Sequence, residues 1–342
     1  MSEFNNFQTS SFFLFFLPLI FSTVFFYWLL GFRFGKKNKI IVEYRKNKRW
    51  GGIVVGISFI ILLTLFQSVI PGFLLPKDFF SLIIGALILL VGGIWDDLKD
   101  LNWKKQLLIQ ALAAIVIVGV GDTINHIRLP GGGVIFLPFW LSLVSAFLWV
   151  TIIINSLNWF DGVDGLSGSV SLVNLLILAA LSVSPLVNQP NTALLCLILA
   201  GIVLGFLFFN FSPAEVYLGS AGVWIIGFVI AVISLYSGGK IATASLIFGF
   251  PLLNFVFVSF KRISLGKWPT IGGDRLHLHE KLIDRGFRPG QVTLVISLLS
   301  FLIGVCALSL QTQGKFLLFT ALLIFFLLFY WSLKRPNSQK EK

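Results

Sequence analysis

The sequence predicts an all-α fold, a polytopic integral membrane protein with about eleven transmembrane helices. Its 342 residues are 57% hydrophobic and only 12% charged, a balance outside the range of soluble globular domains. Apolar runs that are long enough to cross the hydrocarbon layer as helices recur along the whole chain. The expected spans are residues 12–30, 53–70, 79–94, 107–120, 137–154, 166–183, 193–209, 223–236, 242–260, 292–310 and 316–333.

The first run, residues 12–30, has no basic stretch before it and no small-residue cleavage site after it. We therefore expect a retained helix and not a signal peptide. Short loops join the later runs, except at residues 31–52 and 261–291, and no internal repeat divides the chain. These features predict one membrane domain over residues 1–342, with a long loop at 261–291.

The basic residues give the spans an orientation, because Lys and Arg accumulate in cytoplasmic loops. With the N-terminus outside and the C-terminus in the cytoplasm, 22 of the 26 Lys and Arg residues lie in inner segments. The net charge of +12 then reflects topology and contact with anionic lipid, so we expect no nucleic-acid partner. The inner segments that hold these residues are 31–52, 95–106, 261–291 and 334–342.

Two adjacent acids, Asp96 and Asp97, follow the third apolar run on the predicted inner face. Acids at the end of a transmembrane helix are candidates for a functional site. A plainer alternative is a solvated loop in which they pair with Lys99, Lys104 and Lys105. By itself this pair does not decide between the two.

Four polar side chains at three-residue intervals, Asn155, Asn158, Asp161 and Asp164, come directly after the run 137–154. Carboxylates at a bilayer boundary are costly unless they bind a cation, pair with a base or line an aqueous cavity. Helix capping could use one or two of these groups, but hardly all four. The cluster therefore predicts a functional site.

The loop at 261–291 contains Arg275, His277 and His279. Alternating histidines can place both imidazoles on one side of an extended loop near Arg275, an arrangement that suits a diphosphate better than a buried metal. The alternative is a pair of loop histidines without a function. His126 lies on the opposite side of the predicted membrane and is assigned no role.

The order and spacing of these motifs resemble the polyprenyl-phosphate N-acetylhexosamine-1-phosphate transferases, glycosyltransferase family 4. Asp100 and the DRLHLH form of the histidine loop resemble the undecaprenyl-phosphate GlcNAc-1-phosphate transferase branch most closely. The shared motifs are Trp50-Gly51-Gly52, the Asp96 and Asp97 pair, the NxxNxxDGxDGL string from Asn155, the 210–222 loop and the string from Asp274 to His279.

The resemblance implies transfer of an N-acetylhexosamine 1-phosphate from a UDP-sugar to undecaprenyl phosphate, with release of UMP, to start a cell-envelope glycan. It implies Mg²⁺, or Mn²⁺ in its place, and a bacterial inner (plasma) membrane location with the active site facing the cytoplasm. Members of the family are often dimers, so a homodimer is a further expectation. The chain has no GxxxxGK[ST] motif, which argues against nucleotide-driven pumping.

By position in the motifs, the resemblance implies Asp96, Asp97 and Asp161 as catalytic residues, with Asp96 and Asp97 at the lipid phosphate. Asn158 and Asp161 would lie nearest the metal ion. The implied substrate-binding residues are Asn155, Asp164, Arg275, His277 and His279.

Three positions depart from the family pattern. Ser220 stands where the family has the Asp of GDxG, Asn254 where it has the Asp of PxxD, and Glu280 where it has a third His. Either Glu215 or Glu280 supplies the missing charge, or the chain is a catalytically silent homologue that binds polyprenyl phosphate or a partner glycosyltransferase. A transporter is a weaker alternative, because the chain shows no internal repeat.

Overall fold

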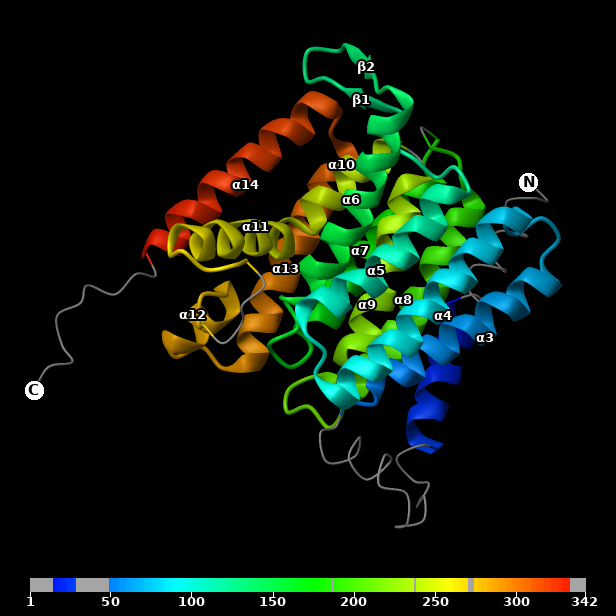
Figure 1. Ribbon diagram of the computed structural model, residues 1–342, viewed down its shortest axis with the longest axis horizontal. Coiled ribbons are helices and arrows are strands. Elements are labelled where there is room, and N and C mark those ends of the chain that lie inside the picture. The colour runs from blue at the N-terminus through cyan, green and yellow to red at the C-terminus, as the bar shows by residue number, and fades with distance from the viewer. Residues whose placement is uncertain (1–14, 29–48, 186, 237, 270–273, 333–342) are drawn as a thin grey trace, which may run out of the picture.

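The computed structural model describes residues 15–28, 49–185, 187–236, 238–269 and 274–332. Within these ranges the protein is mostly helical, and Figure 1 shows the helices packed side by side in one bundle. The helices are Phe15–Trp28, α3 (Gly51–Val69), α4 (Pro76–Lys99), α5 (Trp103–Gly119), α6 (Phe139–Asn158), α7 (Leu166–Val183), α8 (Pro190–Asn210), α9 (Gly219–Leu235), α10 (Gly238–Ile247), α11 (Gly249–Ser264), α12 (Leu278–Asp284), α13 (Pro289–Ser309) and α14 (Thr312–Ser332).

Seven of the described helices are long and apolar enough to cross a membrane: α3, α4, α6, α7, α8, α13 and α14. An eighth span results if α10 and α11, which meet at a bend of 76°, are counted together. The prediction of a polytopic membrane protein is confirmed at this level. Each expected run contains a helix, but α5 and α9 have only 17 residues each, so the count of eleven spans stays a prediction.

A short antiparallel hairpin departs from the expectation of helices alone. Strand β1 (His126–Arg128) pairs with β2 (Val134–Phe136) between α5 and α6, and the hairpin projects from one end of the bundle (Figure 1). Gly132, with φ of 91°, allows the tight reversal. Two three-residue strands are too short to give a recognisable alternation of apolar and polar residues.

Two helices extend beyond their apolar runs into the polar motifs. Helix α4 continues to Lys99 and therefore carries Asp96 and Asp97 in its last turn. Helix α6 continues to Asn158, which leaves Asp161 in the loop that leads to α7. The hydropathy pattern alone predicts helix ends that come too early in the chain. The reason is that Asp96, Asp97 and Asn158, in the last turns, face a cavity and not lipid.

Helix α9 lies at the centre of the packing, and every residue from Ala221 to Leu235 is buried. Helices α3 and α4 approach α9 so closely that backbone packs directly against backbone. A Cβ atom added to Gly52 would lie 2.2 Å from the Gly222 nitrogen, and one added to Gly93 would lie 2.3 Å from the Ala221 Cα. These glycines allow the start of α9 to pack against both α3 and α4.

We expect Gly93→Ala to lower the free energy of unfolding by about 3 kcal/mol, the upper end of the usual range for overpacking. The added methyl group meets the backbone at Ala221, which cannot move aside as a side chain can. Gly119→Ala is the control, because a Cβ atom there meets nothing within 4 Å. Thermal unfolding in detergent measures both, and equal transition temperatures for Gly93→Ala and wild type would contradict the packing argument.

Candidate active site

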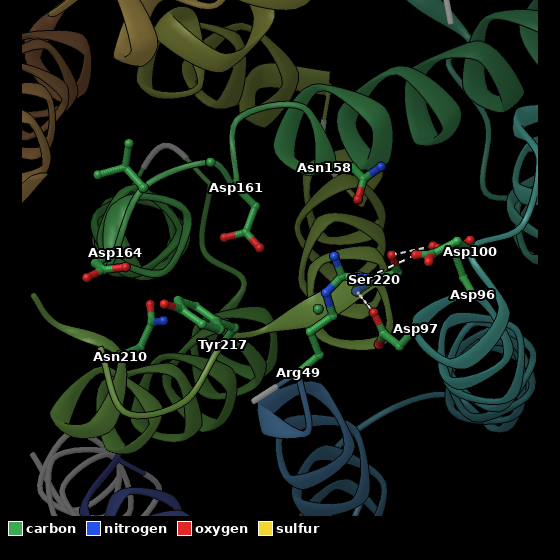
Figure 2. A pocket seen from close by; sticks show the side chains of 13 residues that line it. Arg49, Asp96, Asp97, Asp100, Asn158, Asp161, Asp164, Asn210, Tyr217 and Ser220 are labelled. Atoms are coloured by element: carbon green, nitrogen blue, oxygen red, sulfur yellow. Dashed lines mark hydrogen bonds and ion pairs between the residues drawn. The ribbon is translucent and has the colours of Figure 1, made fainter. Parts of the chain in front are cut away.

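A polar cavity of about 640 Å³ lies where the ends of α4 and α6 meet the start of α9 (Figure 2). Five carboxylates and one cationic side chain are among the described residues that line it. Figure 2 shows that its side chains come from several separate elements. The lining residues are Arg49, Asp96, Asp97, Asp100, Asn158, Asp161, Gly162, Val163, Asp164, Asn210, Tyr217, Gly219 and Ser220.

Asp97 caps the N-terminus of α9 from the neighbouring helix. The Ser220 N–H donates to its Oδ1 at 2.8 Å, and the Ala221 N–H donates to its Oδ2 at 3.3 Å. These are first-turn amides, which have no partner within their own helix. A Cβ atom on Gly219 would lie only 2.7 Å from Oδ2, so the close approach requires glycine there. The acid is thus fixed by backbone donors.

Asp96 is held by three donors. Its Oδ1 accepts from the Leu101 N–H and from Gln106 Nε2, each at 2.9 Å, and its Oδ2 accepts from the Ser220 hydroxyl at 2.5 Å. Asp96 is only 6% exposed and Asp97 only 7%. The alternative of a solvated acid pair is therefore wrong.

Asp161 lies on the loop between α6 and α7, and its Oδ1 accepts a hydrogen bond from the Ser167 hydroxyl. Within the described residues, its Oδ2 has no hydrogen-bond partner. Burial raises the pKa of Asp161 to about 6, while the Ser167 bond and Arg49 act in the opposite direction. A bound cation would favour the charged form, so this carboxylate is suited to hold one.

Asp164 and Asn210 tie the Asp161 loop to the segment before α9. Asp164 Oδ2 accepts from the Ala214 N–H at 3.0 Å, and Asn210 Oδ1 accepts from the Gly165 N–H at 3.0 Å. Gly165, the N-cap of α7, provides no side-chain cap. The four polar side chains of the motif do not serve as a set of helix caps, and this second alternative is also wrong.

Asn155 and Asn158 lie one turn apart on α6 but have different surroundings. Asn155 Nδ2 donates to Gln110 Oε1 at 2.5 Å and to the Thr151 carbonyl at 2.9 Å, which joins α6 to α5. Asn158 lines the cavity. The structure therefore places Asn158, but not Asn155, where it can meet a ligand in this cavity.

The two histidines of the long loop lie beside the cavity and not in its wall. Their rings stack with centroids 5.4 Å apart and planes at 8°, so they share one side, as predicted. A Cβ atom on Gly162 would lie 2.3 Å from His279 Nε2, which shows that His279 supports the Asp161 loop from outside. Burial is the largest cause that lowers the pKa of His277 to about 4 and that of His279 to about 3. Both imidazoles are neutral at pH 7.

A buried arginine that the sequence did not single out, Arg262, acts on the histidine His277. Arg275 is 64% exposed and pairs with Asp284 at 2.6 Å. Arg262 is buried, holds Asp274 through two bonds of 2.8 and 3.0 Å, and lies 4.7 Å from the centre of the Trp159 ring. The Arg262 bonds lower the pKa of Asp274. Arg262 also acts electrostatically on the His277 imidazole, and sequence spacing did not show that this second arginine turns inward. A role for Arg275 in substrate binding stays a prediction.

Sequence reasoning missed several residues of the cavity. It assigned no role to Arg49, Asn210 or Tyr217, although all three line it. The nearest signals in the sequence were the Trp50-Gly51-Gly52 motif and the 210–222 loop. Neither Glu215 nor Glu280, the two acids expected to replace the missing family carboxylate, lines the cavity. Glu215 is exposed, and Glu280 accepts a hydrogen bond from the His277 N–H at 3.1 Å.

The cavity fits a hard divalent cation in part. Its carboxylate and carboxamide oxygens are the ligands that Mg²⁺ prefers. Among the described residues, however, no group of three or more His, Cys, Asp or Glu side chains is placed to hold a metal ion. Mg²⁺ commonly binds through one or two carboxylates plus substrate phosphates. A site with Asn158 and Asp161, completed by a diphosphate, matches that mode.

Fold and cavity together define a multi-pass membrane protein with an acidic site at the ends of its helices. The chain belongs to glycosyl transferase family 4, whose family model matches residues 79–238. A Bacillus subtilis protein named probable undecaprenyl-phosphate N-acetylglucosaminyl 1-phosphate transferase is 32% identical over 72% of this chain and 69% of its own length.

Two further relatives carry similar names. The undecaprenyl-phosphate alpha-N-acetylglucosaminyl 1-phosphate transferase of Escherichia coli O157:H7 is 26% identical over 92% of this chain and 89% of its own length. The decaprenyl-phosphate N-acetylglucosaminephosphotransferase of Mycolicibacterium smegmatis is 26% identical over 79% of this chain and 74% of its own length. The similarity to the Escherichia coli protein therefore covers almost the whole of both chains.

Proposed function

We propose that this protein transfers an N-acetylhexosamine 1-phosphate from a UDP-sugar to undecaprenyl phosphate, releases UMP, and so starts a cell-envelope glycan. The observation that carries this proposal is the convergence of Asp96, Asp97, Asp161 and Asp164 on one cavity in a chain of this family. The relatives' names support a working transferase over a catalytically silent homologue.

The reaction requires positioning and charge stabilisation more than covalent chemistry by the protein. An oxygen of the lipid phosphate attacks the phosphorus that carries the sugar, and the bond from that phosphorus to the UMP oxygen breaks. We assign Asp96 and Asp97 to the lipid phosphate and Asp164 to the nucleotide. Mg²⁺, held by Asn158 and Asp161, would neutralise the diphosphate and the departing UMP.

Asp96 and Asp97 are held for their role by α9. Backbone amides at Ser220 and Ala221 fix the Asp97 carboxylate, and the Ser220 hydroxyl fixes one oxygen of Asp96. Oδ1 of Asp96 already accepts two hydrogen bonds, but Oδ2 of Asp96 and both oxygens of Asp97 accept one each and keep a lone pair, so the pair can accept a proton or orient the acceptor. Preorganised groups of this kind need no rearrangement when the reaction occurs.

We further propose a bacterial plasma-membrane location, eleven spans and a cavity on the cytoplasmic side. With the N-terminus outside, the loops after the first, third, fifth and seventh expected spans all fall on the inner side. Support comes from the meeting of these four loops, represented by Arg49, Asp96, Asp161 and Tyr217, at the same cavity. The hairpin that contains His126, predicted to lie outside, occurs at the other end of the bundle in Figure 1. A homodimer stays a prediction.

The first experiment is a UMP-release assay on the protein purified in detergent. UDP-GlcNAc and other UDP-sugars are supplied with and without undecaprenyl phosphate, and with Mg²⁺ or with a chelator. Release that requires both the lipid and the metal supports the transferase and identifies the sugar. No release with any donor, from folded protein that still binds the lipid, would favour the silent homologue.

Ser220→Asp tests whether the departure from the family pattern impairs the enzyme. The new carboxylate replaces a hydroxyl that donates to Asp96 at 2.5 Å and adds like charge beside Asp97. We expect a lower transition temperature in chelator, recovery in Mg²⁺, and no gain in UMP release. Ser220→Ala, which loses the bond without adding charge, is the control. A large gain in release by Ser220→Asp would show that the natural protein is impaired.

A further inference from the structure

Asn254, on α11, makes two contacts with the start of α12 and is completely buried. Its Oδ1 accepts from the Leu278 N–H at 2.9 Å, and its Nδ2 lies 3.1 Å from Nδ1 of His277. A backbone N–H can only donate, so the first contact fixes which end of the amide is oxygen. The amide nitrogen that faces His277 can also only donate. Nδ1 of His277 must therefore be the acceptor, and the ring proton must be on Nε2.

We propose that Asn254 is a positioning residue that fixes His277 as a neutral imidazole with its proton on Nε2, a constant hydrogen-bond donor to a phosphate oxygen of the substrates. The tautomer follows from the Asn254 contacts alone. Its use for a phosphate rests on the proposed function.

Among the described residues, no carboxylate is hydrogen bonded to Nδ1 of His277. Asp274 is engaged by Arg262 through two hydrogen bonds, and Glu280 accepts from the backbone N–H of His277. His279 stacks on the ring as a second neutral imidazole. Within the described residues, Nε2 of His277 makes no hydrogen bond. That nitrogen is available to a ligand.

Protonation of His277 would create a conflict between two donors. The new Nδ1–H would point at the Asn254 amide group, whose oxygen is already committed to Leu278. Burial and the Arg262 guanidinium also lower the pKa of His277, to about 4, against the smaller opposite effect of Asp274. His277 should thus present an N–H group at every pH where the enzyme works and should not act as an acid or a base.

Asn254→Asp tests this assignment with almost no change in shape. The carboxylate can still accept from the Leu278 N–H, but its second oxygen now requires a proton on Nδ1. We expect the proton of His277 to move from Nε2 to Nδ1, and the pKa of His277 to rise by about 1–3 units, the usual effect of an adjacent opposite charge. Nitrogen and carbon NMR of histidine-labelled protein in detergent measures both quantities.

The sequence has three histidines, so the spectrum can be assigned completely. His277→Gln and His279→Gln identify the two loop signals, and His126, in the distant hairpin, is an internal reference. A wild-type His277 that carries its proton on Nδ1, or that titrates near 6.5, would overturn the assignment.

Kinetics tests the second half of the proposal. We expect Asn254→Asp to raise the KM for the substrates about tenfold at pH 7.5 and to add an ionisation to the pH profile that wild type lacks. A variant with the changed tautomer but unchanged KM would refute the phosphate contact while leaving the tautomer intact. If wild type transfers no sugar phosphate at all, the proposed function fails, and the NMR result still decides the role of Asn254.

Discussion

Replacing Asp161 by Asn should reduce UMP release by at least a hundredfold, the size of effect found when a group that stabilises transition-state charge is removed. Asp161 is fixed through Oδ1 by Ser167, and its Oδ2 has no partner among the described residues, which suits it to a cation. Asn keeps the shape and an acceptor for Ser167 but has no charge. The measurement is UMP release over a range of Mg²⁺ concentrations.

The same variant should be at least as stable as wild type, which separates lost chemistry from lost folding. The pKa of Asp161 is raised from 3.8 to about 6, chiefly by burial. A group with a raised pKa contributes stability that is complete below pH 3.8 and is lost as the pH rises through about 6. Wild type in chelator should therefore lose stability over this range, and Asp161→Asn should lack this component. Full UMP release by the variant would remove Asp161 from the mechanism.

The second large effect is expected at Arg49. It is the one cationic side chain among the described residues that line the cavity, and it interacts electrostatically with both Asp97 and Asp161. Both proposed substrates are anions that must approach five carboxylates. We expect Arg49→Ala to raise the KM for undecaprenyl phosphate about 10–100-fold, the equivalent of one lost charged hydrogen bond. Steady-state UMP release at varied lipid concentration measures this change.

Two controls define what the Arg49 result means. Arg49→Lys keeps the charge and should recover part of the loss. Arg128→Ala removes an arginine from the hairpin at the far end of the bundle and should leave the KM unchanged. Arg49 also pairs with Asp100 at 3.2 Å, but Asp100 is 88% exposed, so this ion pair contributes little to stability. An unchanged KM in Arg49→Ala would assign the acceptor phosphate to other groups.

The sequence by itself determined the class of protein and the positions of its motifs. Long apolar runs predict helices in a membrane because the lipid interior permits little else, and each predicted run contains a described helix. The cost of placing carboxylates beside lipid was enough to identify Asp96, Asp97, Asp161 and Asp164, all of which line the cavity. These inferences need only local composition and spacing.

Only the tertiary structure decided which polar groups face one another. Ser220 and Asp96 are 124 residues apart in the chain, yet they are hydrogen bonded, because glycines bring α3 and α4 into backbone contact with α9. Asn155 faces α5 while Asn158 lines the cavity. Such choices depend on how helices pack against each other and on which side chain fills each gap, and that information is spread over the whole chain.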